Sequence, residues 1–293
     1  MHDNQLGFEI ARIRKEIKMT QIQLSQGICT QPTISMIEKG EIHPGLDILL
    51  AISLKLKKPI TYFINILLMS NYKYVQVLIV ELEELTTNQR YEKVYAIVSE
   101  ELYKKPEDYW FQTFLKWQYH SSAYFLGKAT LETTLQELIL LVQSTDDLIL
   151  NREFLKDRIY NTIAFLYSTR KDYHLALFYY DKIDVGKSNS DAPRLNHDIY
   201  RLRVMYNKTK TLYDMGDYEK SIEHCKDGIK KSIELENMSF IGNFHYYLGQ
   251  CYEKLNMDKE QIKDCYVNAL FFFQLLNRKL YVEIIKKEKE FYL

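Results

Sequence analysis

The sequence predicts an all-α protein in two parts, a small N-terminal helical domain and a longer array of helical hairpins. Three observations predict this fold class. Gly and Pro are scarce, at 10 and 5 of 293 residues, which disfavours sheets joined by tight turns. Apolar residues recur at helical spacing along most of the chain. A short phrase, usually built around Tyr, recurs at the turns after residue 72, which is typical of a repeat architecture.

Composition limits the classes of function. The chain carries 39 Lys and Arg against 39 Asp and Glu, so its formal net charge is zero, which argues against a protein that coats nucleic acid indiscriminately. The four cysteines have no CxxC or metal-ligand spacing, so we expect reduced thiols, no metal and no cofactor, with redox sensing by one thiol as the alternative. The N-terminus lacks signal-peptide character and no apolar run approaches ~20 residues, so we expect a cytoplasmic protein without membrane contact.

Caps and breaks divide residues 6–54 into four short helices. Apolar side chains at helical spacing predict the first helix over residues 6–17. Threonine N-caps begin the second and third helices, and glycines end them, because glycine tolerates the left-handed conformation at a helix C-terminus. These positions are Thr20 and Thr30, then Gly27 and Gly40. A fourth helix is predicted over residues 46–54.

This order resembles the helix-turn-helix domain of Cro/repressor-type regulators. The family pattern TQxxL…G…ISxIExG…P is present between Thr20 and Pro44. The third helix is the candidate recognition helix, since a short helix with an apolar underside fits a DNA major groove about 12 Å wide. Gln31 and Thr33 are candidates for base edges, and Gln21 and Ser35 for phosphates. The full set of candidate DNA-binding residues is Gln21, Thr30, Gln31, Thr33, Ser35 and Lys39.

The segment after this domain is apolar on more than one side. Pro59 restarts a helix over Ile60–Ser70, and such a helix must be covered by other parts of the protein. It is either a spacer packed on the body or a dimer-forming linker. Residues 1–70 have only a slight excess of basic over acidic side chains, which predicts modest DNA affinity per copy and therefore a homodimer on a palindromic site.

Beyond Tyr72 the phrase at the turns occurs five times. The clear copies are QRYEKV, KDYHLA and GDYEKS, and the weaker copies are KATL and NMDK. Their aligned positions, 91, 131, 173, 218 and 258, are spaced by 40, 42, 45 and 40 residues, which predicts stacked helical hairpins. The phrase resembles the start of the second helix in tetratricopeptide (TPR) repeats, although the usual period is ~34 residues. We therefore expect a TPR-like superhelix whose first helices form a concave wall.

An internal repetition marks a candidate site on that wall. The segment YNTIAFLY, from residue 160, recurs as YNKTKTLY, from residue 206. Asn is a mediocre helix former, so Asn161 and Asn207 at the same offset suggest an amide ladder. Each amide offers a donor and an acceptor, so the pair can clamp the main chain of a peptide. The alternative is that both amides bond a neighbouring helix end. Arg203 and Lys210 lie nearby in the sequence and are candidates to meet a carboxylate.

The whole chain resembles the RNPP family of peptide-sensing regulators of Gram-positive bacteria. The segments PITYFINILLMS, YNTIAFLY, GDYEKSIEHC and IGNFHYYLGQCYEKL carry the resemblance. It implies that a short re-imported signalling peptide binds the repeats and that the loaded homodimer activates transcription from a palindromic site. It also implies peptide-clamping roles for Asn161 and Asn207, with flanking contacts from Asn243 and Tyr281. Asn243 stands where the family has Gln, and Gln89 where it has Lys, so the peptide itself need not be the same.

The predicted organisation has three parts. Residues 1–58 form the helix-turn-helix domain, residues 59–74 a linker helix, and residues 75–293 a peptide-sensing domain of about five repeats plus a C-terminal helix. An enzyme is not expected, because no GxxxxGK[ST], HExxH or GxSxG motif occurs. The alternative function is a helix-turn-helix repressor whose repeats dock a partner protein and bind no peptide. The sequence leaves open whether peptide promotes or weakens DNA binding.

Overall fold

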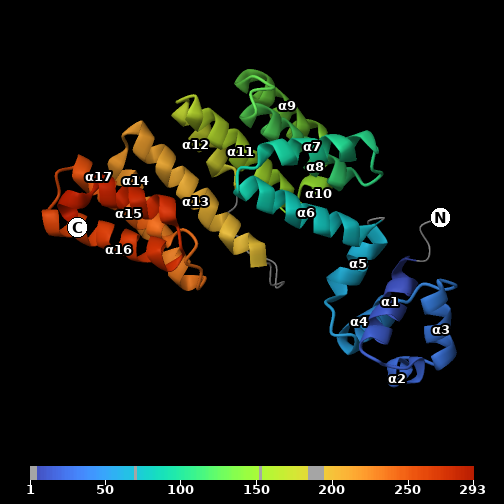
Figure 1. Cartoon of the computed structure of the whole chain (residues 1–293). Helices are drawn as coiled ribbons and strands as arrows, with labels where there is room; N and C mark the ends of the chain where they lie inside the picture. The colour runs from blue at the N-terminus through green and yellow to red at the C-terminus, as the bar shows by residue number, and fades with distance from the viewer. Residues whose placement is uncertain (1–4, 69–70, 152–153, 184–194) are drawn as a thin grey trace. The chain divides into compact units, whose positions relative to one another are not determined.

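The computed structural model describes residues 5–68, 71–151, 154–183 and 195–293, and every regular element in these ranges is a helix (Figure 1). This confirms the predicted all-α class. The chain divides into two compact units, residues 1–129 and 130–293, which are described separately. Within the described ranges no single helix is long and apolar enough to span a membrane; only α5 and α6 taken together reach that length and composition.

The first unit begins with the helix-turn-helix elements. The N-cap signals act as predicted: the Thr20 hydroxyl accepts from the Gln23 backbone N–H while the Gln23 side chain accepts from the Thr20 N–H, and Thr30 caps the next helix. Gly40, with φ of 73°, ends that helix in the left-handed conformation. The elements are α1 (Gln5–Glu16), α2 (Gln21–Ser25), α3 (Gln31–Lys39), α4 (Leu46–Lys55), α5 (Ile60–Leu68), α6 (Tyr72–Thr87), α7 (Tyr91–Tyr103) and α8 (Tyr109–Phe125).

Helix α5 belongs to the core of the helix-turn-helix domain. Phe63 is fully buried and Ile66 almost so, and both lie in the same apolar cluster as residues of α1 to α4. That cluster is made of Leu6, Ile10, Ile13, Leu24, Ile34, Ile37, Leu49, Ile52, Leu56, Phe63 and Ile66. The DNA-binding domain thus covers one apolar side of this helix, while Leu67 on another side stays exposed. Ser70, the predicted end of this helix, lies outside the described residues.

The second unit contains hairpins in which a long first helix packs against a second. The pairs are α11 with α12, α13 with α14, and α15 with α16, and α17 packs on α16. The elements are α9 (Leu131–Ser144), α10 (Asp147–Leu150), α11 (Leu155–Thr169), α12 (Tyr173–Asp181), α13 (Leu195–Met215), α14 (Tyr218–Glu234), α15 (Ile241–Lys254), α16 (Lys259–Leu275), α17 (Lys279–Glu288) and the 3₁₀ turn η2 (Glu290–Tyr292). Figure 1 shows α13 to α17 grouped together toward the C-terminal end of the chain.

The recurring phrase marks the start of the second helix. Tyr91, Leu131, Tyr173 and Tyr218 are the first residues of α7, α9, α12 and α14. The fifth copy is one residue out of register, because Asp258 is the N-cap of α16 and not its first residue. Long helices explain the long period: α13 has 21 residues, and α14 and α16 have 17 each. The short helix α10, which the sequence did not reveal, adds further length after α9.

Close approach between α14 and α15 depends on Gly228. A Cβ at this position would lie 2.4 Å from a ring carbon of Phe244, which is fully buried. Replacing a glycine inside a helix by alanine ordinarily stabilises it by roughly 0.5–1 kcal/mol. The overlap with the ring reverses that sign.

We expect Gly228→Ala to lower the free energy of unfolding by about 1–3 kcal/mol, because α14 must move away from α15. Urea unfolding followed by circular dichroism measures the change. The double variant Gly228→Ala/Phe244→Leu recovers part of the loss, since the smaller side chain makes room. A Gly228→Ala protein at least as stable as the unsubstituted one would contradict this packing.

Candidate functional sites

The third helix presents a polar N-terminal end. The Thr30 hydroxyl, which caps the helix, lies 2.8 Å from the Thr33 hydroxyl. Gln31, Thr33 and Ser35 are half-buried, and their neighbours Ile34 and Ile37 are buried in the core. Lys39, at the other end, is exposed, with its Nζ 3.8 Å from a Glu41 oxygen. The structure thus keeps five of the six predicted positions on α3 or at its N-cap, while Gln21 lies on α2.

A buried ion pair connects this helix to α1. The Arg14 Nε and Nη2 donate to the two oxygens of Glu38 at 2.5 and 2.8 Å, and Arg14 Nη1 donates to the Met19 carbonyl at 2.7 Å. Burial of the Glu38 carboxyl raises its pKa, but the hydrogen bonds from Arg14 and Gln21 outweigh burial, and the pKa is lowered. The carboxylate therefore stays ionised and holds α1 against the recognition helix.

The Glu38 carboxylate is also hydrogen-bonded to two glutamine side chains in series. Gln21 donates to Glu38 at 2.9 Å, and the Gln21 carbonyl accepts from the Gln31 amide at 2.8 Å. Gln31, predicted to meet base edges, is thereby held at a fixed angle by Gln21, which the sequence assigned to phosphates. The sequence did not reveal these contacts of Gln31. They depend on side-chain rotamers that connect Gln21 to residues 10 and 17 positions further along the chain.

The two repeated asparagines meet between neighbouring helices. Asn207 Nδ2 on α13 donates to Asn161 Oδ1 on α11 at 3.1 Å, and both side chains are half-buried. A second cross-helix bond joins the Thr211 and Ser168 hydroxyls at 3.0 Å. The amides therefore bond each other, and not a helix end, which was the alternative. This bond uses the Asn207 NH₂ and the Asn161 carbonyl. The other group of each amide, the Asn161 NH₂ donor and the Asn207 carbonyl acceptor, matches the acceptor and donor of a peptide main chain.

Tyr206 interacts with two other residues predicted to contact the peptide, Asn243 and Tyr281. Its hydroxyl hydrogen-bonds with Asn243 on α15 and interacts electrostatically with Tyr281 on α17. Burial, and to a smaller extent Tyr281, raises the pKa of Tyr206 to about 12. The Tyr281 ring stacks on Phe273 with centroids 4.8 Å apart. Tyr206, which is half-buried and was not singled out from the sequence, thus links the two predicted residues Asn243 and Tyr281 beside the chain position of Asn207.

The nearby cations are largely neutralised. Lys210 pairs with Asp214 on the same helix at 2.5 Å, and Lys208 pairs with Asp181 on α12 at 2.7 Å. Arg203 is half-buried one turn before Asn207. A peptide carboxylate would therefore have to compete with an aspartate for Lys210.

Redox and metal chemistry find little support among the described residues. Three of the free cysteines, Cys225, Cys251 and Cys265, are buried, and burial raises the thiol pKa of Cys251 and of Cys265 to about 11. Burial also raises the pKa of Cys29, which is half-exposed. Across the part of the chain that the structure describes, no group of three or more His, Cys, Asp or Glu is arranged to hold a metal.

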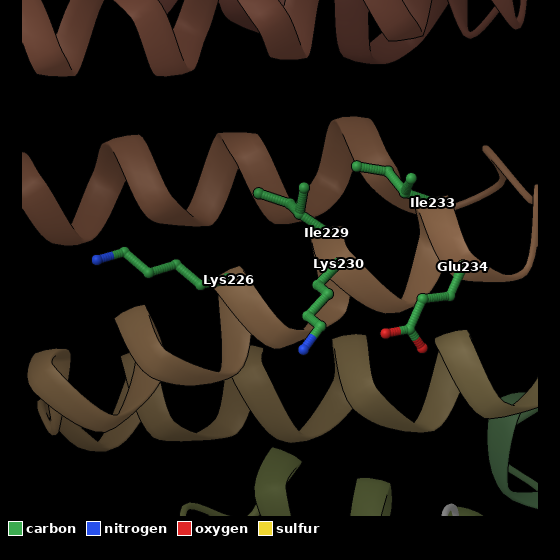
Figure 2. Close-up of a pocket in the computed structure, with 5 residues that line it drawn as sticks. All are labelled: Lys226, Ile229, Lys230, Ile233 and Glu234. Carbon is green, nitrogen blue, oxygen red and sulfur yellow. The ribbon is translucent and has the colours of Figure 1, made fainter.

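A shallow depression lies on a second helix, away from the asparagine pair. It is formed by one stripe of α14 made of Lys226, Ile229, Lys230, Ile233 and Glu234. Figure 2 shows the two isoleucines extending to one side, while the ends of Lys230 and Glu234 extend to the other. None of the residues predicted from the sequence lines this depression.

Known proteins define the class to which this fold and these sites belong. A helix-turn-helix family model matches residues 10–63, and the model of the RNPP family C-terminal domain matches residues 79–293. These are the parts of a helix-turn-helix regulator of transcription that responds to peptides, and not of an enzyme. The chain belongs to the RNPP family.

Solved structures agree with this assignment. Bacillus thuringiensis PlcR in complex with the peptide PapR7 and DNA is 31% identical, with 96% of this chain and 99% of that chain covered and a TM-score of 0.83. PlcR from the same organism in its apo form is 30% identical over 96% and 98% of the two chains, with a TM-score of 0.66. ComR from S. thermophilus, at 16% identity over 98% and 99% and a TM-score of 0.59, shares the fold. No curated protein matches the sequence.

The buried ion pair between α1 and α3 yields a stability prediction. We expect Glu38→Gln to lower the free energy of unfolding of the helix-turn-helix domain by about 3–5 kcal/mol at pH 7, because Arg14 keeps its charge without a partner. The folded pKa of Glu38 is lowered, so its contribution is present above the ordinary carboxyl pKa and is lost as pH falls below it. The difference in free energy of unfolding between the unsubstituted and Glu38→Gln proteins therefore becomes smaller in acid.

Urea unfolding of both proteins at pH 7 and near pH 3 measures this effect. The matched control is Glu41→Gln, since Glu41 is exposed and pairs only loosely with Lys39, so little change is expected. Equal stability of the Glu38→Gln protein and the control at pH 7 would show that the pair does not hold α3.

Proposed function

We propose that this protein binds a palindromic DNA site as a homodimer in the cytoplasm and activates transcription when a short signalling peptide binds its repeats. In this proposal residues 1–58 read DNA, with α5 packed on their core, and residues 75–293 sense the peptide. The segment 59–74 connects them. The single observation that carries the peptide site is the Asn207–Asn161 hydrogen bond, which places two amides at one level on adjacent first helices.

The proposed DNA contacts lie on and beside α3, the proposed recognition helix. Gln31 is ordered by Gln21 and Glu38, so little side-chain entropy is lost when it meets a base edge. Thr30 and Thr33 lie beside it at the helix N-terminus, where backbone N–H groups favour phosphates. Ser35 and Lys39 are further proposed contacts. Two such helices reading half-sites one turn apart require about 34 Å between them.

The peptide end rests on residues around the asparagine pair. The Asn161 NH₂ is proposed to donate to a peptide carbonyl and the Asn207 carbonyl to accept from a peptide N–H. Asn243 and Tyr281 are proposed to flank the peptide, with Tyr206 holding both in place. Arg203 and Lys210 are proposed for its carboxylate groups. That PlcR, which is 31% identical, has been solved in complex with a peptide and DNA supports peptide binding by the repeats.

Calorimetric titration with a panel of short synthetic peptides tests the site. We expect one peptide to bind saturably, and Asn161→Ala/Asn207→Ala to weaken it by tenfold or more, since two main-chain hydrogen bonds of about 0.5–1.5 kcal/mol each are lost. Asn161→Asp is the sharper variant. Its carboxyl oxygen still accepts from Asn207, so the helix contact is kept while the donor to the peptide is removed.

The matched control is Asn268→Ala on α16, an exposed asparagine bonded only to the backbone of its own helix. It is expected to bind the peptide as the unsubstituted protein does. If Asn161→Asp and Asn161→Ala/Asn207→Ala bind as tightly as this control, the amide site is wrong. If no peptide binds, the alternative of a repressor whose repeats dock a partner protein becomes the leading function.

A further inference from the structure

The Glu9 carboxylate on α1 has its hydrogen-bonding capacity filled by three different helices. Its Oε1 accepts from Arg12 Nη2 at 2.6 Å and from the Tyr62 hydroxyl, and its Oε2 accepts from Arg12 Nε at 2.9 Å and from Lys73 Nζ at 2.6 Å. A carboxylate offers about four acceptor positions, and all four are used here. Arg12 lies on α1 itself, Tyr62 on α5 and Lys73 on α6.

This cluster is sheltered and permanently charged. The Glu9 side chain is only 8% exposed. Burial raises its pKa, but the hydrogen bonds from Arg12, Lys73 and Tyr62 outweigh burial and lower the pKa to about 2. One of the two counter-charges, Arg12, comes from α1 itself, and the other, Lys73, comes from α6.

Other contacts tie the same end of α6 to the DNA-binding domain. The Asn71 backbone N–H, at the N-cap of α6, donates to the Gln5 side chain of α1 at 3.4 Å. Tyr72 packs on the helix-turn-helix core and lies edge-on to Tyr62, with centroids 5.8 Å apart. Lys73 is the one charged contact in this group, and it bonds a carboxylate that is already ordered.

Helix α1 links this cluster to the recognition helix. A Cβ on Gly7 would lie 2.2 Å from the Ile37 carbonyl, so the backbones of α1 and α3 are in direct contact. Arg14 on α1 holds Glu38 on α3. A displacement of α1 by α6 therefore moves the recognition helix as well, because neither contact has room to yield.

We propose that Glu9 is a positioning residue: with Tyr62 and Lys73 it forms a latch that fixes α6, the first helix of the repeats, on the DNA-binding domain. The latch passes changes in the tilt of the repeats to the recognition helix. Its role in switching rests on the proposed peptide and DNA binding, whereas its role in attaching α6 does not.

A second cluster of the same chemistry supplies matched controls. On α6 and α7 the Tyr74 hydroxyl donates to Glu101 at 2.6 Å, and Lys104 Nζ bonds the same oxygen at 2.7 Å. Glu101 is as buried as Glu9. This cluster does not involve α1 or α5, so Tyr74→Phe and Lys104→Met reproduce the chemical change without touching the latch.

Hydrogen exchange in the full-length protein tests the attachment. We expect Lys73→Met, and to a smaller degree Tyr62→Phe, to speed exchange of the amides of α1 and the first half of α6 about tenfold, because both segments then open locally. Lys104→Met and Tyr74→Phe leave the amides of α1 unchanged, because their bonds to Glu101 join α6 and α7 and not α1. Lys73→Arg restores slow exchange by returning the charge. Unchanged exchange in Lys73→Met, or equal acceleration in Lys104→Met, overturns the latch.

A second measurement distinguishes signalling from mere stability. The ligands are a peptide from the panel and a DNA duplex selected from a random pool. Lys73→Met should bind each of them alone with an affinity within about twofold of that of the unsubstituted protein. The ratio of its DNA affinities with and without peptide, however, should fall toward one. If exchange changes but this ratio does not, the latch attaches α6 without transmitting the signal, and the switching role is refuted. If no peptide binds, the proposed function fails while the exchange result stands.

Discussion

Stacking of helical hairpins is the constraint on which the second unit depends. Each hairpin has apolar stripes that it cannot bury alone, so its neighbours must cover them at a fixed spacing. Gly228 lets α14 approach Phe244 of α15. In the same way Gly249 lets α15 approach α16, since a Cβ on Gly249 would lie only 3.0 Å from a ring carbon of Tyr266. The spacing of the first helices follows from this packing. Asn161 and Asn207 are within hydrogen-bond distance because the cores around them fix α11 and α13, so the candidate site is a product of the repeat geometry.

The DNA-binding domain is organised around α1. One end of this helix contacts α5 and α6 through Glu9, and the other holds α3 through Arg14. Both contacts use a sheltered carboxylate with a lowered pKa. Such groups are costly to bury without partners, and each is fully paired here. Helices α1 to α5 thus form one packed domain in which Gln31 is hydrogen-bonded to Gln21, and Lys73 of α6 forms an ion pair with this domain.

The sequence predicted those features that depend on neighbours along the chain. Thr20, Thr30 and Gly40 act as caps because capping is local, and the start of α12 and α14 followed from a recurring phrase. The pairing of Asn161 with Asn207 was within reach because the repeat period places equal offsets side by side. In each case a rule of one helix or one repeat was sufficient.

Features that join distant segments were not predictable in the same way. The Glu9 cluster brings together residues 53 and 64 positions apart, and no periodicity reports such a contact. Helix α5 was expected to need a cover, but its burial by the DNA-binding domain depends on where Phe63 and Ile66 fit among the side chains of α1 to α4. Lys210 was expected to meet a carboxylate of the ligand, whereas in the structure it pairs with Asp214 of its own helix.

In the proposed function the peptide and DNA sites act on one conformational equilibrium, and reciprocal binding measures this coupling most directly. The affinity for a selected DNA duplex is measured with and without the peptide, and the affinity for the peptide with and without that duplex. Coupling through one equilibrium requires the two ratios to be equal, and a value of about 5–150 is expected. Ratios of one in both directions would mean that the two sites are independent, which would contradict a peptide-responsive regulator.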